Sequence, residues 1–448
     1  MIDIATALAL LFAAACIMVG INDSVAAGRL SLLSCSLFAM AGVYGLTWPL
    51  IMYTTTSGDN PFWGMWLLHN ENIYAIHTVM ATLFAVGTYV GWHCSRGTEA
   101  TTAHNATQIG KAEGKVWINS CWSLSAIAAL TQLAYAHAYG GLEAQLDYSA
   151  LVRSGVFDQV PSNSLSFLAP FPKLALVACF GFFGLILSGY RTASVFVGLC
   201  ISFSISVYVF YNTLWRLGFG MFVFTFVIAV ALAKVQSVKR QIAVIFFIGP
   251  LLLLLLDYIS NALELKPADT TIEFVVKELS FPFGGFFAHW GAEAGQLRAF
   301  KDIAMIPVYV LPSSIWGEWI DTADEANTAL IMGAPKGHSE VTASIPVDAI
   351  TFGFMQAHII GVLFVGFLFG SGLRWLQRAL DAIQPIGVRV TFQASMALAA
   401  ACFPVFYADP SLLVNVNFHW LLGLLVAGCI ARITSRARIP TDLRASGQ

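Results

Sequence analysis

The fold class is decided by stretches such as residues 167–189, FLAPFPKLALVACFGFFGLILSG, in which Lys173 is the single charged side chain. Residues 242–260, IAVIFFIGPLLLLLLDYIS, repeat this character and reach a charge only at Asp257. A helix needs about 20 mostly apolar residues to cross the hydrocarbon core of a bilayer. Both stretches therefore predict membrane-spanning helices.

Working outward from these two stretches, eleven apolar runs of this kind can be read along the chain. We predict an all-α polytopic membrane protein with about 11 transmembrane helices, within a range of about 10 to 14. The first run is not expected to be a signal peptide, because its start, Met1-Ile2-Asp3, contains no basic n-region and no clear cleavage site follows. The runs cover residues 2–20, 30–53, 73–94, 117–138, 167–189, 194–213, 217–234, 242–260, 351–373, 389–408 and 411–431.

Composition excludes several classes of protein. Hydrophobic residues make up 58% of the 448 residues and charged residues only 11%, which is far from the balance of a soluble domain. A formal net charge of -2 gives no reason to expect a nucleic-acid partner. All 8 cysteines lie in or beside apolar runs, which argues against a disulfide framework or a zinc site. Since no nucleotide-binding or metalloprotease motif occurs either, we expect no cofactor and no metal.

The positions of Lys and Arg predict the orientation, because cytoplasmic segments are enriched in both. With a cytoplasmic C-terminus, 15 of the 23 basic residues fall inside, and an odd number of spans places the N-terminus outside. The eight basic residues expected outside are Arg153, Lys173, Arg216, Lys266, Lys277, Arg298, Lys301 and Lys336.

The predicted spans divide the chain into three parts. Residues 1–260 form the first eight helices, 261–350 form a large external loop, and 351–448 form the last three helices and a cytoplasmic tail. The loop carries 12 of the 25 acidic residues, and within it Thr271–Leu279 and Phe300–Leu311 are expected to form short interfacial helices. A loop this long is either an external decoration on a transporter or a catalytic cap over a membrane cavity.

Four basic residues on the external side are candidate ligands for an anionic group. Arg216 lies at the outer junction of two spans, where a guanidinium could hold phosphate oxygens. The alternative is that Arg216 extends its charge to the membrane surface beside Trp215. Arg153, Lys277 and Arg298 are the further candidates, because several external basic residues run against the usual topological bias.

His338 is the candidate catalytic base. It lies in Gly333-Ala334-Pro335-Lys336-Gly337-His338-Ser339-Glu340, where two glycines and a proline predict an exposed turn shortly before the ninth span. A loop histidine more often has no catalytic role, and His289 is the second candidate. The external carboxylates that could serve instead are Asp147, Asp158, Asp257, Glu278 and Glu340.

These features together resemble a known family, the Wzy-type oligosaccharide repeat-unit polymerases of O-antigen and enterobacterial common antigen. The resemblance rests on the long external loop before the last three spans, on Gly337-His338-Ser339 near its end, and on Arg216 opening an outward-facing span. By layout it covers most of the chain, and by residues about a quarter. The closest local similarities are Val308–Trp316, Lys336–Pro346, Leu214–Arg216 and Tyr148–Pro172. Leu214-Trp215 departs from the glycine or serine that often precedes the family's arginine, and Lys277 or Arg298 would replace further arginines of the loop.

The resemblance implies a GT-C-like bundle of the class shared with O-antigen ligases, in a bacterial inner membrane. It implies a metal-independent glycosyltransferase that joins undecaprenyl-pyrophosphate-linked oligosaccharides at the periplasmic face, with a chain-length regulator as a further partner. Arg216, with Arg153, Lys277 and Arg298, would hold the pyrophosphate, and His338 would accept the proton of the attacking hydroxyl. Two alternatives stay open: a flippase or transporter of lipid-linked oligosaccharide, and an O-antigen ligase.

Overall fold

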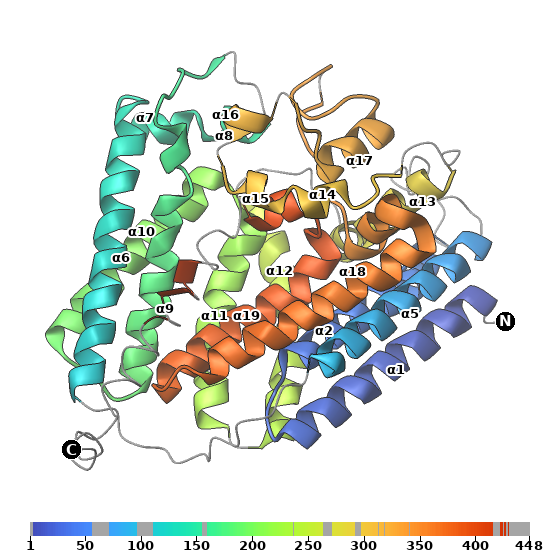
Figure 1. Ribbon diagram of the computed structural model, residues 1–448, viewed down its shortest axis with the longest axis horizontal. Helices are drawn as coiled ribbons and strands as arrows, with labels where there is room; N and C mark the ends of the chain where they lie inside the picture. The colour runs from blue at the N-terminus through green and yellow to red at the C-terminus, as the bar shows by residue number, and fades with distance from the viewer. Residues whose placement is uncertain are drawn as a thin grey trace, which may run out of the picture.

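The computed structural model describes residues 3–55, 71–95, 111–154, 159–235, 237–262, 271–291, 297–311, 313–317, 319–339 and 341–414, and the five residues 422, 423, 425, 426 and 429. Throughout these ranges the regular structure is helical, and they contain no β-strand (Figure 1). Nine segments in the described part of the chain are long and apolar enough to cross a membrane. The prediction of an all-α polytopic membrane protein is confirmed at this level.

The nine segments coincide with nine of the eleven predicted runs. The run 117–138 lies in a helix of 27 residues, Lys111–His137, but polar residues such as Asn119 and Gln132 interrupt its apolar surface, and it is not among the nine. The run 411–431 and the tail after it lie largely outside the described residues. The segments are Ile4–Ala27, Leu32–Ile51, Asn72–Cys94, Ser166–Leu187, Ala193–Thr213, Arg216–Lys234, Val238–Ile259, Ala349–Asp381 and Ile386–Phe406.

The long helices follow one another along the chain, and shorter helices lie between some of them (Figure 1). The second span is composite, because a π-helical stretch, η1, separates two α-helices. The elements are α1 Ile4–Ala27, α2 Leu32–Met40, η1 Ala41–Leu46, α3 Thr47–Thr55, α5 Glu71–Cys94, α6 Lys111–His137, α7 Leu142–Asp147, α8 Ser149–Ser154, η3 Ser166–Leu168, η4 Phe171–Lys173, α9 Leu174–Leu187, α10 Ala193–Thr213, α11 Arg216–Lys234, α12 Val238–Ala262, α13 Thr271–Gly291, α14 Lys301–Ala304, α15 Ile306–Tyr309, α16 Ser313–Trp316, α17 Ala323–Met332, α18 Ala349–Asp381 and α19 Ile386–Phe406.

Helices α5 and α18 approach each other closely, and glycines make this approach possible. Gly87 and Gly91 on α5 face Gly366 and Gly370 on α18, so each helix presents two glycines four residues apart. A Cβ atom added at Gly370 would lie 1.9 Å from the carbonyl oxygen of Thr88. The two backbones are therefore in direct contact, as in the small-residue interfaces that associate helices in membranes.

Helix α18 is broken near its N-terminal end. Ala357 and His358 leave helical geometry, with φ of -159° and 50°. A Cβ atom added at Gly353 would lie 2.6 Å from the Cα atom of Val362, a distance that a continuous helix does not allow over nine residues. The first two turns of α18 are therefore folded back against the long part that follows.

The broken segment is hydrogen-bonded by the chain that precedes α14. The backbone N–H of Arg298 donates to the carbonyl of Met355 at 2.9 Å, and that of Ala299 donates to the carbonyl of Gln356 at 3.0 Å. Non-helical backbone is tolerated at membrane depth only where protein covers it or a cavity lies beside it. The segment before α14 thus stabilises the break.

The region 261–350 is more helical than its description as a loop predicts. Helix α13 has 21 residues and extends well beyond the expected interfacial helix over Thr271–Leu279. The extension occurs because residues 281–287 carry aromatic side chains, of which Phe283, Phe286 and Phe287 are buried in the hydrophobic core. The second expected helix, over Phe300–Leu311, corresponds to the short helices α14 and α15.

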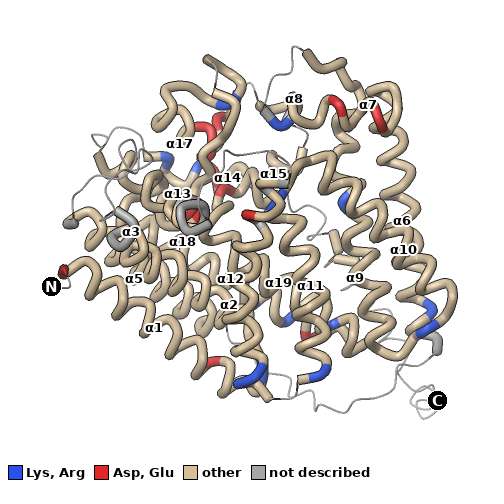
Figure 2. The backbone as a smooth tube through the Cα atoms, turned by 180° about the vertical axis from the view of Figure 1, so that it is seen from behind, with Lys and Arg blue, Asp and Glu red and all other residues tan. Residues whose placement is uncertain are grey.

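Charged residues gather toward two opposite ends of the helix bundle, and the backbone between them is almost free of charge (Figure 2). At one end Arg29, between α1 and α2, forms an ion pair with Asp381 at the end of α18. The other end, which we call the external end after its predicted side, carries α7, α8, α14 and α17 (Figures 1 and 2).

Candidate functional site

The site begins at the junction of α10 and α11. Leu214 ends α10 in the left-handed region, with φ of 49°, and α11 starts two residues later at Arg216. The Nη2 atom of Arg216 lies 3.8 Å from Oε1 of Glu278 on α13, and the two side chains are only 17% and 19% exposed. Arg216 is therefore held against the external segment in a largely buried position.

Arg153 joins Arg216 from the short helix α8. The hydroxyl of Ser149, on the same helix, donates to Oδ1 of Asn212 at 2.8 Å and so fixes α8 to the end of α10. Partial loss of solvent and, after it, the like charge of Arg216 lower the pKa of Arg153, while Glu278 acts in the opposite direction. Two guanidinium groups thus share one neighbourhood, and a bound anion would relieve their repulsion.

A third cation, Lys336, lies in the turn after α17 and is affected by the charge of Arg153. Gly337 has φ of 86° and its N–H donates to the carbonyl of Val341 at 2.7 Å, which closes the turn. Burial lowers the pKa of Lys336, and the charge of Arg153 lowers it further. We call Arg153, Arg216 and Lys336 the basic cluster.

His338 lies in the same turn, two residues after Lys336. Its backbone N–H donates to the carbonyl of Pro335 at 3.2 Å, and its own carbonyl accepts from the N–H of Val341 at 2.9 Å. The residue is exposed. The turn therefore presents His338 at the surface beside the segment that carries Lys336.

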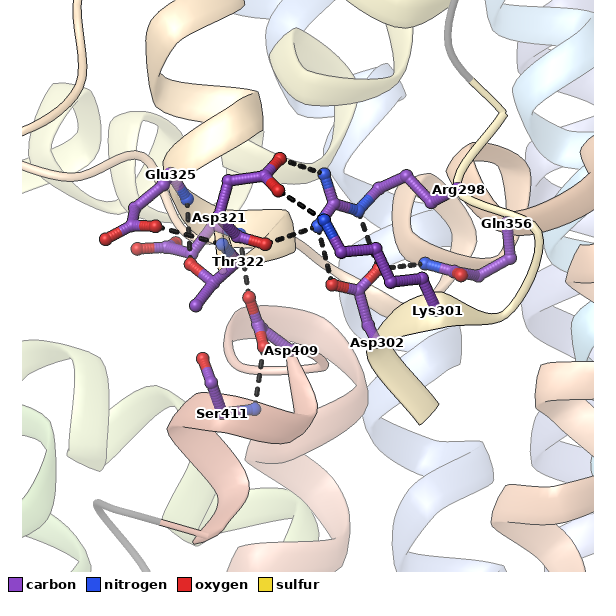
Figure 3. A network of polar contacts seen from close by, with 10 residues as sticks. Arg298, Lys301, Asp302, Asp321, Thr322, Glu325, Gln356, Asp409 and Ser411 are labelled. Atoms are coloured by element: carbon purple, nitrogen blue, oxygen red, sulfur yellow. Dashed lines mark hydrogen bonds and ion pairs between the residues drawn. The ribbon is translucent and has the colours of Figure 1, made fainter. Parts of the chain in front are cut away.

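Arg298 lies in a different group of charges, drawn in Figure 3. Its Nε and Nη2 atoms donate to the two carboxylate oxygens of Asp302 at 2.6 and 2.7 Å, and Nη1 donates to Asp321 at 2.7 Å. Asp302 is fully buried and also accepts from Nε2 of Gln356, beside the break in α18, at 2.7 Å. Arg298 therefore ties the external segment to α18, with its guanidinium engaged by two carboxylates.

The remaining candidates are spread over the external end. Lys277 lies in α13 directly before Glu278, and its side chain is outside the described residues. His289 forms a hydrogen bond of 3.2 Å with Oδ1 of Asn327, and burial lowers the pKa of His289 to about 4, so its ring is neutral at pH 7. This contact connects α13 with α17.

The candidate carboxylates lie in different parts of the chain. Glu278 is part of the site beside Arg216, Asp147 ends α7, and Asp257 lies near the end of α12. Asp158 and Glu340 are outside the described residues. In the part of the chain that the structure describes, no group of three or more His, Cys, Asp or Glu side chains is arranged to hold a metal ion.

Two further buried carboxylates, Asp324 and Asp409, were not identified from the sequence. The backbone N–H of Asp324 donates to Oδ2 of Asp409 at 2.7 Å, and the side chains are almost completely buried. Burial and, after it, the charge of Asp409 raise the pKa of Asp324 to about 7. The only local signal is the capping box between Thr322 and Glu325, which predicts the start of α17 and nothing about a partner 85 residues away.

The fold and the site together define an α-helical polytopic membrane protein with electrostatically coupled basic residues and a buried pair of carboxyl groups in the segments between its apolar helices. No family model matches the chain, and no curated protein or solved structure matches it either.

Proposed function

We propose that this chain is a glycosyltransferase that joins lipid-linked oligosaccharide units at the external face of a bacterial cytoplasmic membrane. Undecaprenyl-pyrophosphate-linked oligosaccharides would be both donor and acceptor. The observation that carries the proposal is the electrostatic interaction of Arg153 with both Arg216 and Lys336, which come from three separate parts of the chain. A cationic site at the end of a membrane bundle suits a substrate with an anionic head and a lipid tail.

In the proposed reaction an acceptor sugar hydroxyl attacks the anomeric carbon of the donor. The new glycosidic C–O bond forms while the bond from the anomeric carbon to the pyrophosphate oxygen breaks, and the pyrophosphate leaves with the electron pair. The negative charge that develops on this leaving group is what fixed cations stabilise. Arg216 and Arg153 would bind it, with Lys336 as a third charge and Lys277 as a further candidate.

The hydroxyl proton needs an acceptor, and His338 is the proposed base. A neutral imidazole accepts a proton near pH 7, and the turn holds His338 two residues from Lys336. Arg298 would act in this scheme by holding the external segment on α18, because its donors already serve Asp302 and Asp321. A chain-length regulator would be a further partner.

A transporter of lipid-linked oligosaccharide is the second candidate function, and the broken helix α18 favours it. Broken helices with buried polar groups are typical of transport sites. Here the break lies beside buried Asp302 and Gln356. A ligase that moves glycan to another lipid acceptor would use the same cations and base, so the products have to separate these activities.

The test is the glycan made by cells that lack the gene and carry a plasmid copy. Wild-type protein should restore long glycan ladders, whereas Arg216→Ala should leave single repeat units at the surface. Arg216→Lys should restore chain length only in part, because lysine keeps the charge but loses the planar pair of donors.

Arg191 offers a matched control for Arg216. It is an exposed arginine in the α9–α10 connection, at the opposite end of α10 from Arg216. Arg191→Ala should therefore leave the ladders unchanged at equal protein level. Loss of all surface glycan, single units included, in the Arg216→Ala strain would favour the transporter or the ligase instead.

A further inference from the structure

We infer that residues 303–319 form an apolar loop that inserts into the lipid bilayer at the external end of the helix bundle. We call these residues the apolar loop. The inference is argued from the exposed side chains of the loop, from its own small core, and from the contact of its first turn with a membrane span. It goes beyond the proposed function, because it requires neither the basic residues nor the reaction described above.

The apolar loop exposes large apolar side chains and carries almost no charge. Residues 303–317 contain no charged residue, and Glu318 is the single charge in the remainder. Isolated apolar residues are common on protein surfaces, whereas five large ones within fourteen positions indicate a contact with a membrane or a protein. The exposed residues are Ile306, Val310, Leu311, Ile315 and Trp319.

The apolar loop is folded around a small core of its own. Tyr309 and Trp316 are buried, and their ring centroids lie 5.0 Å apart. Both pack with Val414 from the segment after α19. The Nε1 atom of Trp316 donates to the carbonyl of Leu311 at 2.9 Å, which closes the turn between α15 and α16. The exposed side chains therefore form the outer side of a folded loop.

Ion pairs hold the two ends of the apolar loop together (Figure 3). Arg298 and Lys301 precede the loop, Asp321 follows it, and both cations donate to this one carboxylate. The distance from Nη1 of Arg298 to Oδ2 of Asp321 is 2.7 Å. Charge is thus confined to the base of the loop, and apolar side chains cover its body. This division is typical of segments that enter a bilayer from the aqueous side.

The chain enters the apolar loop from the surface of a membrane span. Phe300, directly before α14, packs against Phe364 of α18 with ring centroids 5.1 Å apart. Ile360, Phe364 and Leu368 are exposed and spaced by four residues, so they lie on one face of α18. An exposed apolar face of a membrane-spanning helix contacts lipid. The apolar loop therefore continues a lipid-facing surface, and this continuity favours the bilayer over a soluble partner.

Trp319 lies where the apolar loop returns to charged sequence. It is 81% exposed, follows Glu318 directly and precedes Asp321 by two residues. Tryptophan is enriched at the boundary between hydrocarbon and headgroups, because its ring is apolar and its N–H group is polar. This position agrees with Trp319 at the headgroup level and the charged base of the loop in water.

The first test labels the wild-type protein from the lipid. The full-length protein is placed in phosphatidylcholine vesicles that carry a diazirine on an acyl chain, and light links the lipid to the residues that it touches. Mass spectrometry of the digested protein should find label in residues 303–319. Helix α17 is the matched control, because Leu330 and Met332 are exposed apolar residues on it, but α17 lies outward of α14 and α15 (Figure 1). It should carry little label.

Spin labels then separate contact with lipid from contact with protein. Val310→Cys and Ile315→Cys each carry a nitroxide in plain phosphatidylcholine vesicles. Collisions with oxygen, which concentrates in lipid, should be frequent, and those with a water-soluble nickel chelate rare, as in the lipid reference Ile360→Cys. Leu330→Cys on α17 should show the reverse. The exposed native cysteines are replaced by serine in all these proteins, namely Cys94, Cys200 and Cys429.

Three outcomes would overturn the inference. Frequent nickel collisions at Val310 and Ile315 would mean that the apolar loop lies in water. Rare collisions with both reagents would mean that a second copy of this chain or another protein covers it. Equal lipid labelling of α17 and the apolar loop would mean that exposure alone explains the label. The photolabelling uses wild-type protein and so decides the matter even if a cysteine variant does not fold. None of these measurements involves glycan synthesis, so the proposed function stands or falls separately.

Discussion

Replacement of Gly370 by alanine should separate α5 from α18 and destabilise the bundle. The new Cβ atom would lie 1.9 Å from the carbonyl oxygen of Thr88, where ordinary contact begins at 3.4 Å. The helices would have to part by about 1.5 Å at this point, because the opposing atom belongs to the backbone and has no rotamer to change. Overpacking of a core typically costs about 1–3 kcal/mol.

Gly372 provides the matched control on the same helix. A Cβ atom added there meets nothing within 4 Å. Both substitutions gain up to about 1 kcal/mol of helix propensity, so the difference between them isolates the clash. Thermal unfolding in one detergent should place Gly370→Ala well below Gly372→Ala, with the latter at or above wild type. Equal melting temperatures for the two variants would refute the direct backbone contact.

Three further predictions concern the external end. Arg298→Met should leave the buried carboxylate of Asp302 unpaired at a cost of about 3–5 kcal/mol, seen as faster proteolysis of the segment before α18; wild-type resistance would contradict this. Asp324→Asn should raise the melting temperature at pH 8. The pKa of the wild-type carboxyl is shifted from 3.8 to about 7, so ionising it in the folded protein costs up to about 4 kcal/mol at this pH. The gain should vanish toward pH 4, and a gain independent of pH would argue against the pKa shift. His338→Ala should melt like wild type yet polymerise about a hundred- to ten-thousand-fold more slowly, and normal chain growth would remove His338 from the scheme.

The spans could be predicted because long apolar runs are a local property of sequence. The break in α18 could not, since the run 351–373 contains no proline and reads as one continuous apolar helix. It depends on Gly353 meeting Val362 and on hydrogen bonds from Arg298, which are contacts of the folded chain. Helix α13 was underestimated for a related reason, because glycines and Pro282 interrupt its aromatic sequence while packing maintains the helix.

The candidate site shows the same limit. Arg153 and Arg216 could be chosen from sequence because both are basic residues on the side where such residues are scarce. The electrostatic interaction of Arg153 with Lys336 joins residues more than a hundred positions apart, and no local pattern predicts it. Asp324 and Asp409 are likewise paired by the fold, so the carboxyl with the raised pKa became visible only in three dimensions.

The most direct measurement is glycan chain growth by the purified protein in liposomes supplied only with an undecaprenyl-pyrophosphate-linked repeat unit. The wild-type protein should convert single units into a ladder of longer lipid-linked chains and release free undecaprenyl pyrophosphate, and Arg216→Ala should lose nearly all of this activity. A wild-type protein that is folded and bound to the substrate but leaves every repeat unit single would contradict the proposed reaction.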